Sequence, residues 1–216
     1  MTPEGQPPLP KLAYVVDDDD AFRASVVLLL ESSGWIVEGF ESLEKFSRRA
    51  AELEPGLVLL DLHLGSASGL DLIESDEPAL EAFAIVMVTG AGEVASAVRA
   101  MKAGAADFVE KTSAPDELLD RLDRIHASFT VEFEQRSARL DARKRITRLS
   151  GRERDVLERL LSGASNKMIA RDLRLSPRTV EMHRARMLAK LGVATTAEAL
   201  DIGRRADVKP VTRGGD

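Results

Sequence analysis

The chain has 216 residues, of which 44% are hydrophobic and 31% are charged, a balance typical of a globular protein with one or two domains. It contains no cysteine, which excludes disulfides, thiolate metal sites and cysteine nucleophiles. The net charge of −6 is unevenly spread: residues 1–112 hold 8 Lys and Arg against 20 Asp and Glu, whereas residues 149–216 hold 14 against 9. This asymmetry predicts an acidic domain suited to a cation and a basic domain suited to nucleic acid.

The two ends of the chain, residues 1–11 and 208–216, are expected to be tails. The first ten residues include prolines at positions 3, 7, 8 and 10 and lack the basic start and apolar core of a signal peptide. No apolar run approaches the roughly 20 residues that span a bilayer. We therefore expect a cytoplasmic protein with no membrane partner.

Residues 12–126 alternate short apolar runs with helical segments. The runs expected to form strands are Leu12–Val16, Ile36–Phe40, Leu57–Leu60, Ile85–Val88 and Phe108–Val109. The helical segments between them are Ala21–Glu31, Leu43–Leu53, Gly69–Ser75 and Val94–Ala103. This repeated pattern predicts the α/β class, with a doubly wound five-stranded parallel sheet and helices on both faces.

Past Pro115 the pattern is helical. Apolar residues recur every three or four positions at Leu118, Leu122, Ile125, Phe129 and Phe133. This spacing predicts a fifth domain helix that continues into a helical linker over residues 127–147. A dimeric coiled coil is the alternative, although Arg136 and Arg143 fall where that seam needs apolar residues.

Residues 148–207 are expected to form an all-α, four-helix domain. Ser150 and Glu153 have the spacing of a capping box, Gly163 ends the first helix, and Ser176 and Pro177 begin the third. A short turn joins the second helix, at about residues 166–173, to the third. This arrangement is typical of a helix-turn-helix, whose second helix enters the major groove of double-stranded DNA.

Polar side chains follow four of the predicted strands. Asp17 and Asp18 follow the first, Asp61 the third, Thr89 the fourth and Lys111 the fifth. Because the carboxyl ends of parallel strands lie at one edge of a sheet, these groups are expected to converge. They suit phosphoryl transfer to a carboxylate: Asp61 is the expected nucleophile, Asp17 and Asp18 hold Mg²⁺, and Lys111 and Thr89 contact the phosphoryl oxygens.

The strings that carry these residues resemble the receiver domain of two-component response regulators. They are Val15–Asp19, Leu60–Leu62 with Ser68–Leu70, Val88–Gly90 and Met101–Lys111. The resemblance implies that a sensor histidine kinase phosphorylates Asp61, that Mg²⁺ is required, and that the backbone carbonyl of His63 completes the metal shell without a role for its imidazole. It also implies that Phe108 rotates with Thr89 when the phosphoryl group binds.

The sequence departs from that family in two places. Residues 62–66 lack the usual proline, and Thr112 follows Lys111 where a cis proline is usual. The second departure leaves the position of Lys111 less firmly fixed.

A second resemblance, over residues 148–207, is to the LuxR-type domain of the FixJ/NarL response regulators. It is carried by Leu149–Leu157, Gly163–Ala170 and Ser176–Met187. It implies base-reading positions at Glu181, Met182 and Ala185 and phosphate contacts at Lys167, Thr179, His183, Arg184 and Arg186, and the same exposed side carries Arg178. Related domains often have Lys at the position of Glu181, which either accepts from a cytosine amino group or pairs with Arg178 or Arg184.

These observations predict a response regulator and not an enzyme: a phosphoacceptor with at most slow self-dephosphorylation. Phosphorylation of Asp61 is expected to favour a homodimer or release the DNA-binding helices, and so regulate transcription, with RNA polymerase as a further candidate partner. One alternative is a Mg²⁺-dependent aspartyl phosphatase. That enzyme needs a second carboxylate two residues after Asp61, and this chain has His63 there, which argues against the alternative. The other is a constitutive DNA-binding protein whose receiver domain is only structural.

Overall fold

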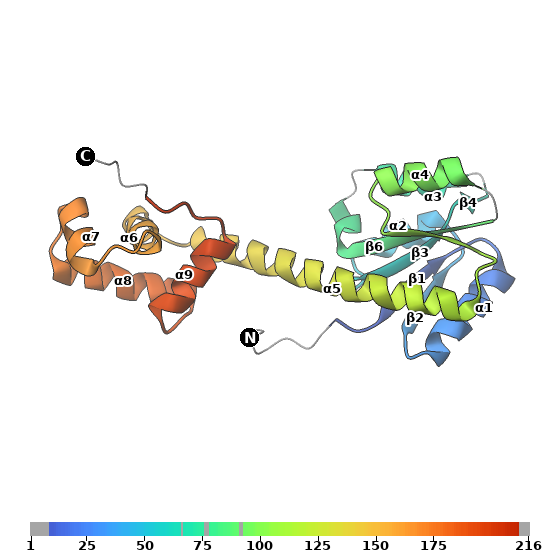
Figure 1. The fold of residues 1–216 in the computed structure, drawn as a ribbon, viewed down its shortest axis with the longest axis horizontal. Helices are drawn as coiled ribbons and strands as arrows, with labels where there is room; N and C mark the ends of the chain where they lie inside the picture. The colour runs from blue at the N-terminus through green and yellow to red at the C-terminus, as the bar shows by residue number, and fades with distance from the viewer. Residues whose placement is uncertain (1–8, 66, 76–77, 91–92, 212–216) are drawn as a thin grey trace. The chain divides into compact units, whose positions relative to one another are not determined.

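The computed structural model describes residues 9–65, 67–75, 78–90 and 93–211. The chain divides into two compact units, of which the first ends at Phe133 and the second begins at Glu134 (Figure 1). Among the described residues, no helix is both long and apolar enough to cross a membrane.

The first unit contains the predicted parallel sheet. Its strands are β1 (Leu12–Val16), β2 (Ile36–Phe40), β3 (Gly56–Asp61), β6 (Phe83–Thr89) and β7 (Asp107–Glu110). They pair in the order β2-β1-β3-β6-β7, and every pairing is parallel. This confirms the doubly wound, flavodoxin-like α/β fold, in which functional groups gather where the strand order reverses.

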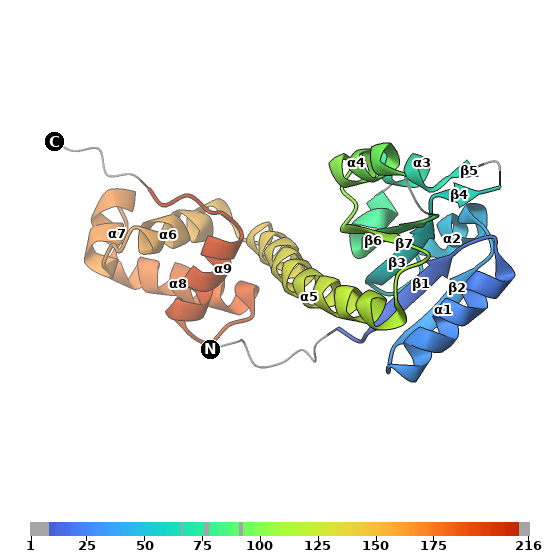
Figure 2. The same cartoon turned by 45° about the vertical axis from the view of Figure 1, so that its right-hand side comes forward.

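Helices cover both faces of this sheet (Figure 2). They are α1 (Asp20–Ser32), α2 (Leu43–Ala50), α3 (Gly69–Glu74), α4 (Val94–Lys102) and the first part of α5 (Pro115–Ile146). Side chains of α1 and α5 pack on one face, and side chains of α2, α3 and α4 pack on the other. The sequence did not predict the hairpin of β4 (His63–Leu64) and β5 (Ala67–Ser68) or the 3-10 turn η1 (Pro78–Ala82).

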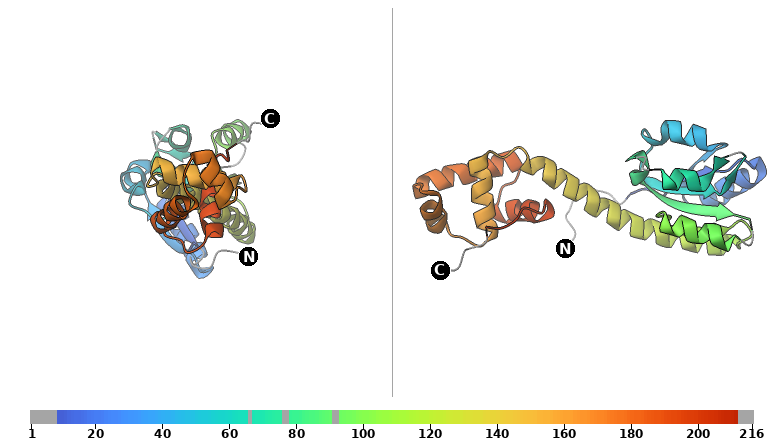
Figure 3. Two further views of the ribbon diagram at one scale, coloured as in Figure 1. Left: turned by 90° about the vertical axis from the view of Figure 1, so that its left-hand side faces the viewer. Right: turned by 90° about the horizontal axis from the view of Figure 1, so that it is seen from above.

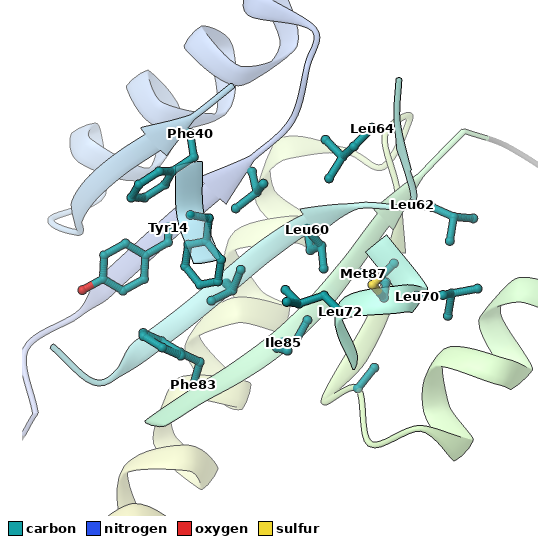
Figure 4. Packing of buried hydrophobic residues seen from close by; sticks show 14 of the residues in the cluster. Tyr14, Phe40, Leu60, Leu62, Leu64, Leu70, Leu72, Phe83, Ile85 and Met87 are labelled. Atoms are coloured by element: carbon teal, nitrogen blue, oxygen red, sulfur yellow. The ribbon is translucent and has the colours of Figure 1, made fainter. Parts of the chain in front are cut away.

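Strand alternation divides the apolar residues between two cores. Along β1, Ala13 and Val15 point to the core under α1 and α5, whereas Tyr14 and Val16 point to the opposite core. Figure 4 shows the second core, with Tyr14 and Phe40 among its labelled residues. The rings of both residues pack against Phe46, which is fully buried. Because β3 and β6 are buried on both faces, their sequences are unbroken apolar runs up to their last residues. Those last residues are Asp61 and Thr89.

The helix expected at the end of the first domain and the expected helical linker form one continuous helix. This helix, α5, has 32 residues and ends at Ile146. Leu118 and Leu122 anchor its first turns in the sheet core, and Ala142 and Ile146 are buried near its end.

The second unit contains the expected four helices, α6 (Gly151–Leu161), α7 (Asn166–Leu173), α8 (Pro177–Leu191) and α9 (Thr196–Arg205) (Figure 3). Each begins at a Ser or Thr whose hydroxyl accepts a backbone N–H of the first turn, and Ser150 with Glu153 forms the predicted capping box. The turn between α7 and α8 passes through Arg174 at φ 55°, and Gly192 ends α8 at φ 68°. These features confirm the helix-turn-helix arrangement.

Candidate functional site

Three carboxylates meet at the carboxyl edge of the sheet. Asp17 follows β1, Asp61 ends β3, and these strands are neighbours with Val16 opposite Leu60. Asp17 and Asp61 are 1% and 4% exposed, whereas Asp18 is open to solvent. Each offers an oxygen, and the three oxygens lie within 4.8 Å of one another.

Lys111 reaches this cluster from the end of β7. Its Nζ lies 2.8 Å from Asp17 Oδ2 and 3.0 Å from Asp61 Oδ2, and 4.7 Å from the centre of the Phe22 ring. Its backbone N–H donates to the Thr89 carbonyl at 2.7 Å, which continues the pairing of β7 with β6. The described chain has no cis peptide bond, so Thr112 follows Lys111 through a trans bond and the lysine still reaches both carboxylates.

The electrostatics of the cluster favour an additional cation. Burial raises the pKa of the Asp61 carboxyl; the hydrogen bond from Lys111 opposes this shift and the neighbouring charge of Asp17 adds to it. Burial lowers the pKa of the Lys111 ammonium, but its close contacts with the carboxylates of Asp17 and Asp61 outweigh this effect and leave that pKa raised. One ammonium therefore faces three carboxylates and leaves two negative charges uncompensated.

This donor set fits Mg²⁺, a hard cation that binds carboxylate oxygen and water. The closeness of the three oxygens satisfies the geometric requirement, and the residual negative charge supplies the attraction. His63 starts β4 two residues after Asp61.

Thr89 and Phe108 lie beside the cluster on adjacent strands. Thr89 is fully buried, and its hydroxyl makes no hydrogen bond. Phe108, paired with Met87 in the sheet, is partly buried and lines a groove of about 550 Å³ together with Glu93 and Val98. The unbonded hydroxyl is available to a phosphoryl oxygen.

Sequence reasoning missed Glu93, which precedes α4. Its Oε1 lies 2.7 Å from His63 Nε2, so the imidazole of His63 has a partner of its own. The only sequence signal was an acid four residues after Thr89, a position where acids also occur simply to complement a helix dipole.

The proposed DNA-contacting residues lie on α8 and at the start of α7. Arg178, Glu181, Met182, Ala185, Arg186 and Lys167 are exposed, and Thr179, His183 and Arg184 are half-buried. Val180, Met187 and Leu191 hold the opposite side of α8 in the core. The Thr179 hydroxyl lies 2.8 Å from that of Ser176 and is engaged at the start of the helix.

Several basic residues elsewhere in the second unit form ion pairs with acids. Arg152, Arg154 and Arg205 pair with acids on their own helices, and Lys190 pairs with Glu153. Within the described chain, Lys167, Arg178, Arg184 and Arg186 have no ion pair, and Glu181 pairs with neither Arg178 nor Arg184. The unpaired cations are free to bind phosphates.

Comparisons with known proteins match both parts of the chain. Residues 13–123 match the response regulator receiver domain, and residues 147–202 match the bacterial regulatory proteins of the luxR family. The transcriptional regulatory protein FixJ of Azorhizobium caulinodans is 39% identical, over 91% of this chain and 93% of that protein. FixJ of Bradyrhizobium diazoefficiens is 35% identical, over 89% of this chain and 94% of that protein.

Two solved structures extend the likeness. The response regulator StyR matches 91% of this chain and 100% of its own with a TM-score of 0.78 and 30% identity. Full-length FixJ from B. japonicum matches 91% of this chain and 97% of its own, with a TM-score of 0.54 and 34% identity.

The fold and the matches define a class: the chain belongs to the response regulators that join a receiver domain to a LuxR-type DNA-binding domain. Like the FixJ proteins it resembles over most of its length, it is a two-component response regulator that controls transcription.

Proposed function

We propose that Asp61 is the phosphoacceptor through which a sensor histidine kinase controls this regulator. The position of Lys111 between Asp17 and Asp61 carries this proposal, because it places a buried carboxylate beside a cation that can neutralise an incoming phosphoryl group. An Asp61 oxygen forms a bond to phosphorus as the phosphorus–nitrogen bond of the kinase phosphohistidine breaks. The electron pair of that bond stays on the histidine nitrogen, which takes up a proton from water.

Asp17, Asp18, Asp61 and the backbone carbonyl of His63 are the proposed ligands of Mg²⁺. The ion supplies positive charge that offsets the negative charge of the phosphoryl group. Lys111 and the Thr89 hydroxyl contact the phosphoryl oxygens, and slow attack by water on phosphorus returns Asp61 to its free form.

Phosphorylation is proposed to change the surface between Val94 and Lys111. Movement of Thr89 toward the phosphoryl group leaves space into which Phe108 turns, which alters the groove beside α4. The outer side of α4 carries exposed Val94, Val98 and Met101, an apolar stripe that suits a homodimer of the phosphorylated form.

The proposed boundaries follow this division of labour. Residues 12–126 form the receiver domain, residues 127–147 a helical linker and residues 148–207 the DNA-binding domain, with tails at residues 1–11 and 208–216. In α8, Glu181, Met182 and Ala185 read bases, with Arg178 on the same exposed side. Phosphates are held by Lys167 of α7 and by Thr179, His183, Arg184 and Arg186 of α8. Because the protein acts on DNA, we propose that it is cytoplasmic, with RNA polymerase as a candidate partner.

The test compares wild type with Asp61→Asn and with Asp71→Asn, which removes the same charge from an exposed position on α3. Each protein is incubated with Mg²⁺ and acetyl phosphate, or with the cognate kinase and ATP. We then follow intact mass, oligomer size and binding to the DNA that lies upstream of the gene for this protein. Wild type and Asp71→Asn should gain one phosphoryl group and change association or DNA affinity, and Asp61→Asn should do neither. Equal DNA binding by wild type and Asp61→Asn with no phosphoryl group on either, even with the kinase, would instead establish a constitutive regulator.

A further inference from the structure

The last turn of α5 contacts the carboxyl end of α8, the helix that is proposed to read bases. Arg145 Nη1 donates to the backbone carbonyl of Leu191, the last residue of α8, at 3.2 Å. The two residues are 46 positions apart in the chain. Both lie in the second unit, but Arg145 precedes the segment, residues 147–202, that matches the luxR family. The contact therefore ties α8 to a part of the chain outside that match.

The Leu191 carbonyl is one of the four that the end of a helix leaves without a partner inside the helix. The backbone N–H of Gly192 turns back to the carbonyl of Ala189, which satisfies a different member of this set. The guanidinium of Arg145 supplies the donor for Leu191. It also places a positive charge at the end of α8 where the backbone dipole is negative, an arrangement that stabilises a helix end.

Arg145 is oriented by its own helix. Its Nε lies 2.7 Å from Asp141 Oδ2, one turn earlier in α5, and its side chain is 37% exposed. The next residue, Ile146, is buried in the apolar core that contains Met187 and Leu191. The end of α5 therefore gives the carboxyl end of α8 both an oriented cation and an apolar anchor.

The two ends of α8 are fixed by different parts of the chain. Near its start, Val180 packs in a separate apolar core with Ile169 and Ala170 of α7. Its last turn is fixed by the contacts with the end of α5. The proposed base-reading residues, which fall within residues 181–185, lie between these anchors. Because a recognition site must be held to within about 0.5 Å, the placement of these side chains depends on both ends of the helix.

We propose that Arg145 is a positioning residue for DNA recognition, which holds α8 through the Leu191 carbonyl in the orientation that its base-reading side chains need. This inference rests on the proposed function, since it concerns the helix assigned to reading bases. Arg145 acts through α8 and does not itself contact DNA. The last turn of α5 is then a working part of the DNA-reading domain as well as the end of the linker.

The experiment uses the full chain as wild type, Arg145→Gln, Arg145→Lys and Asp141→Asn. Arg143→Gln is the matched control, because Arg143 is exposed on the last turn of α5 and its loss changes the net charge equally. With acetyl phosphate and Mg²⁺ present, each protein is titrated with a duplex obtained by binding-site selection on wild type, and with a scrambled duplex of the same composition. The ratio of the two dissociation constants measures sequence discrimination. All titrations are made far below the thermal unfolding of each variant, so a loss of stability alone leaves this ratio unchanged.

Arg145→Gln should lower discrimination about two- to fivefold, the range expected for a cation at a helix carboxyl end. The salt dependence of binding should stay the same, because no phosphate contact is lost. Asp141→Asn should also lower discrimination, although it changes the net charge in the opposite direction. Arg145→Lys should lose less than Arg145→Gln, since it keeps a cation beside α8, and Arg143→Gln should match wild type. In the free protein, Arg145→Gln should shift the backbone amide resonances of residues 181–185.

The two proposals fail differently. If wild type discriminates and Arg145→Gln discriminates equally well, the positioning role of Arg145 is wrong. If Arg145→Gln weakens binding to both duplexes alike and reduces the salt slope, Arg145 holds a phosphate, which also overturns the inference. Should Arg145→Gln fail to fold, Asp141→Asn carries the same test with the guanidinium still present. If wild type itself shows no sequence preference, the base-reading role of α8 is wrong, and this inference falls with it.

Discussion

The ammonium of Lys111 lies almost equally close to Asp17 and Asp61, at 2.8 and 3.0 Å from their Oδ2 atoms. It holds together two buried carboxylates that would otherwise repel each other. With Asp18 also at the site, a single cation balances three acids, and burial raises the pKa of the Asp61 carboxyl. An ionised Asp61 therefore lowers the stability of the folded protein when no divalent cation is bound.

Asp61→Asn should therefore stabilise the receiver domain when divalent cations are removed with EDTA. The expected gain is about 0.5–2 kcal/mol, typical of relieving a strained functional site. Because the folded-state pKa of Asp61 is raised, its folded form favours the protonated carboxyl. At pH values below the unfolded pKa, about 3.9, wild type and the variant should have the same free energy of unfolding. As the pH rises through the folded pKa, wild type should become less stable than the variant. Urea unfolding from about pH 3 to pH 8 measures this difference. A variant less stable than wild type at pH 7 would contradict the prediction.

Mg²⁺ should reverse that order. An ion that binds only the folded state stabilises it by about 2.7 kcal/mol at one hundred times its dissociation constant. Wild type should gain this stability on titration with MgCl₂, whereas Asp17→Asn and Asp61→Asn should gain much less. Thermal unfolding with and without EDTA measures the effect, with Asp71→Asn as the control that should respond like wild type. An equal response in all four proteins would exclude the acidic cluster as the binding site.

The sheet and its functional edge could be predicted from the sequence because the signals are local and periodic. The apolar runs of β1, β3 and β6 indicate buried parallel strands. Because the carboxyl ends of such strands lie at one edge of the sheet, the convergence of Asp17, Asp61 and Thr89 could be predicted from local patterns alone. Helix ends could be predicted equally well, since the capping residues Ser150, Glu153 and Gly192 interact with backbone groups only a few residues away.

Contacts between distant side chains were not predictable in the same way. The His63–Glu93 pair depends on a hairpin, β4–β5, that has only two residues in each strand and no periodic pattern. The effect of Thr112 was likewise undecided from sequence, because the anchoring of Lys111 comes from its backbone bond to Thr89 across the sheet.

The ion pair between buried Glu153 and partly exposed Lys190 should make the stability of the second unit sensitive to acid. Glu153 is 3% exposed, and its Oε2 accepts from Lys190 Nζ at 2.7 Å and from the Ser150 N–H at 2.7 Å. Burial alone would raise the pKa of the Glu153 carboxyl, but these hydrogen bonds outweigh it and the pKa is lowered.

The stability that Glu153 contributes is therefore present above its unfolded pKa, about 4.3, and is lost as pH falls through the lower folded value. Glu153→Gln should cost about 1–2 kcal/mol at pH 7, the lower range for hydrogen bonds to a charged group, since Lys190 is partly exposed. Hydrogen exchange of α6 and α8 amides in the full chain measures this. Near pH 3 the variant and wild type should converge, and a constant difference across pH would show that charge is not the cause. Glu158→Gln, which removes a surface pair with Arg154, is the control.

Glu181 and Arg184 should have separable effects on DNA binding, because one is proposed to read a base and the other to hold a phosphate. An unpaired carboxylate on a surface that meets phosphates is unfavourable unless it accepts a hydrogen bond, and the cytosine amino group in the major groove offers one. Glu181→Gln should lower discrimination for that base by about 1–3 kcal/mol and leave the salt dependence nearly unchanged. Arg184→Ala should weaken binding to all sequences alike and reduce the salt slope by about 1. Binding-site selection followed by titrations between 50 and 200 mM salt separates the two.

Arg154→Ala on α6, which removes a cation already paired with Glu158, should change neither quantity. If Glu181→Gln retains the wild-type base preference, Glu181 does not read the operator, and specificity passes to Met182, Ala185 and Arg178.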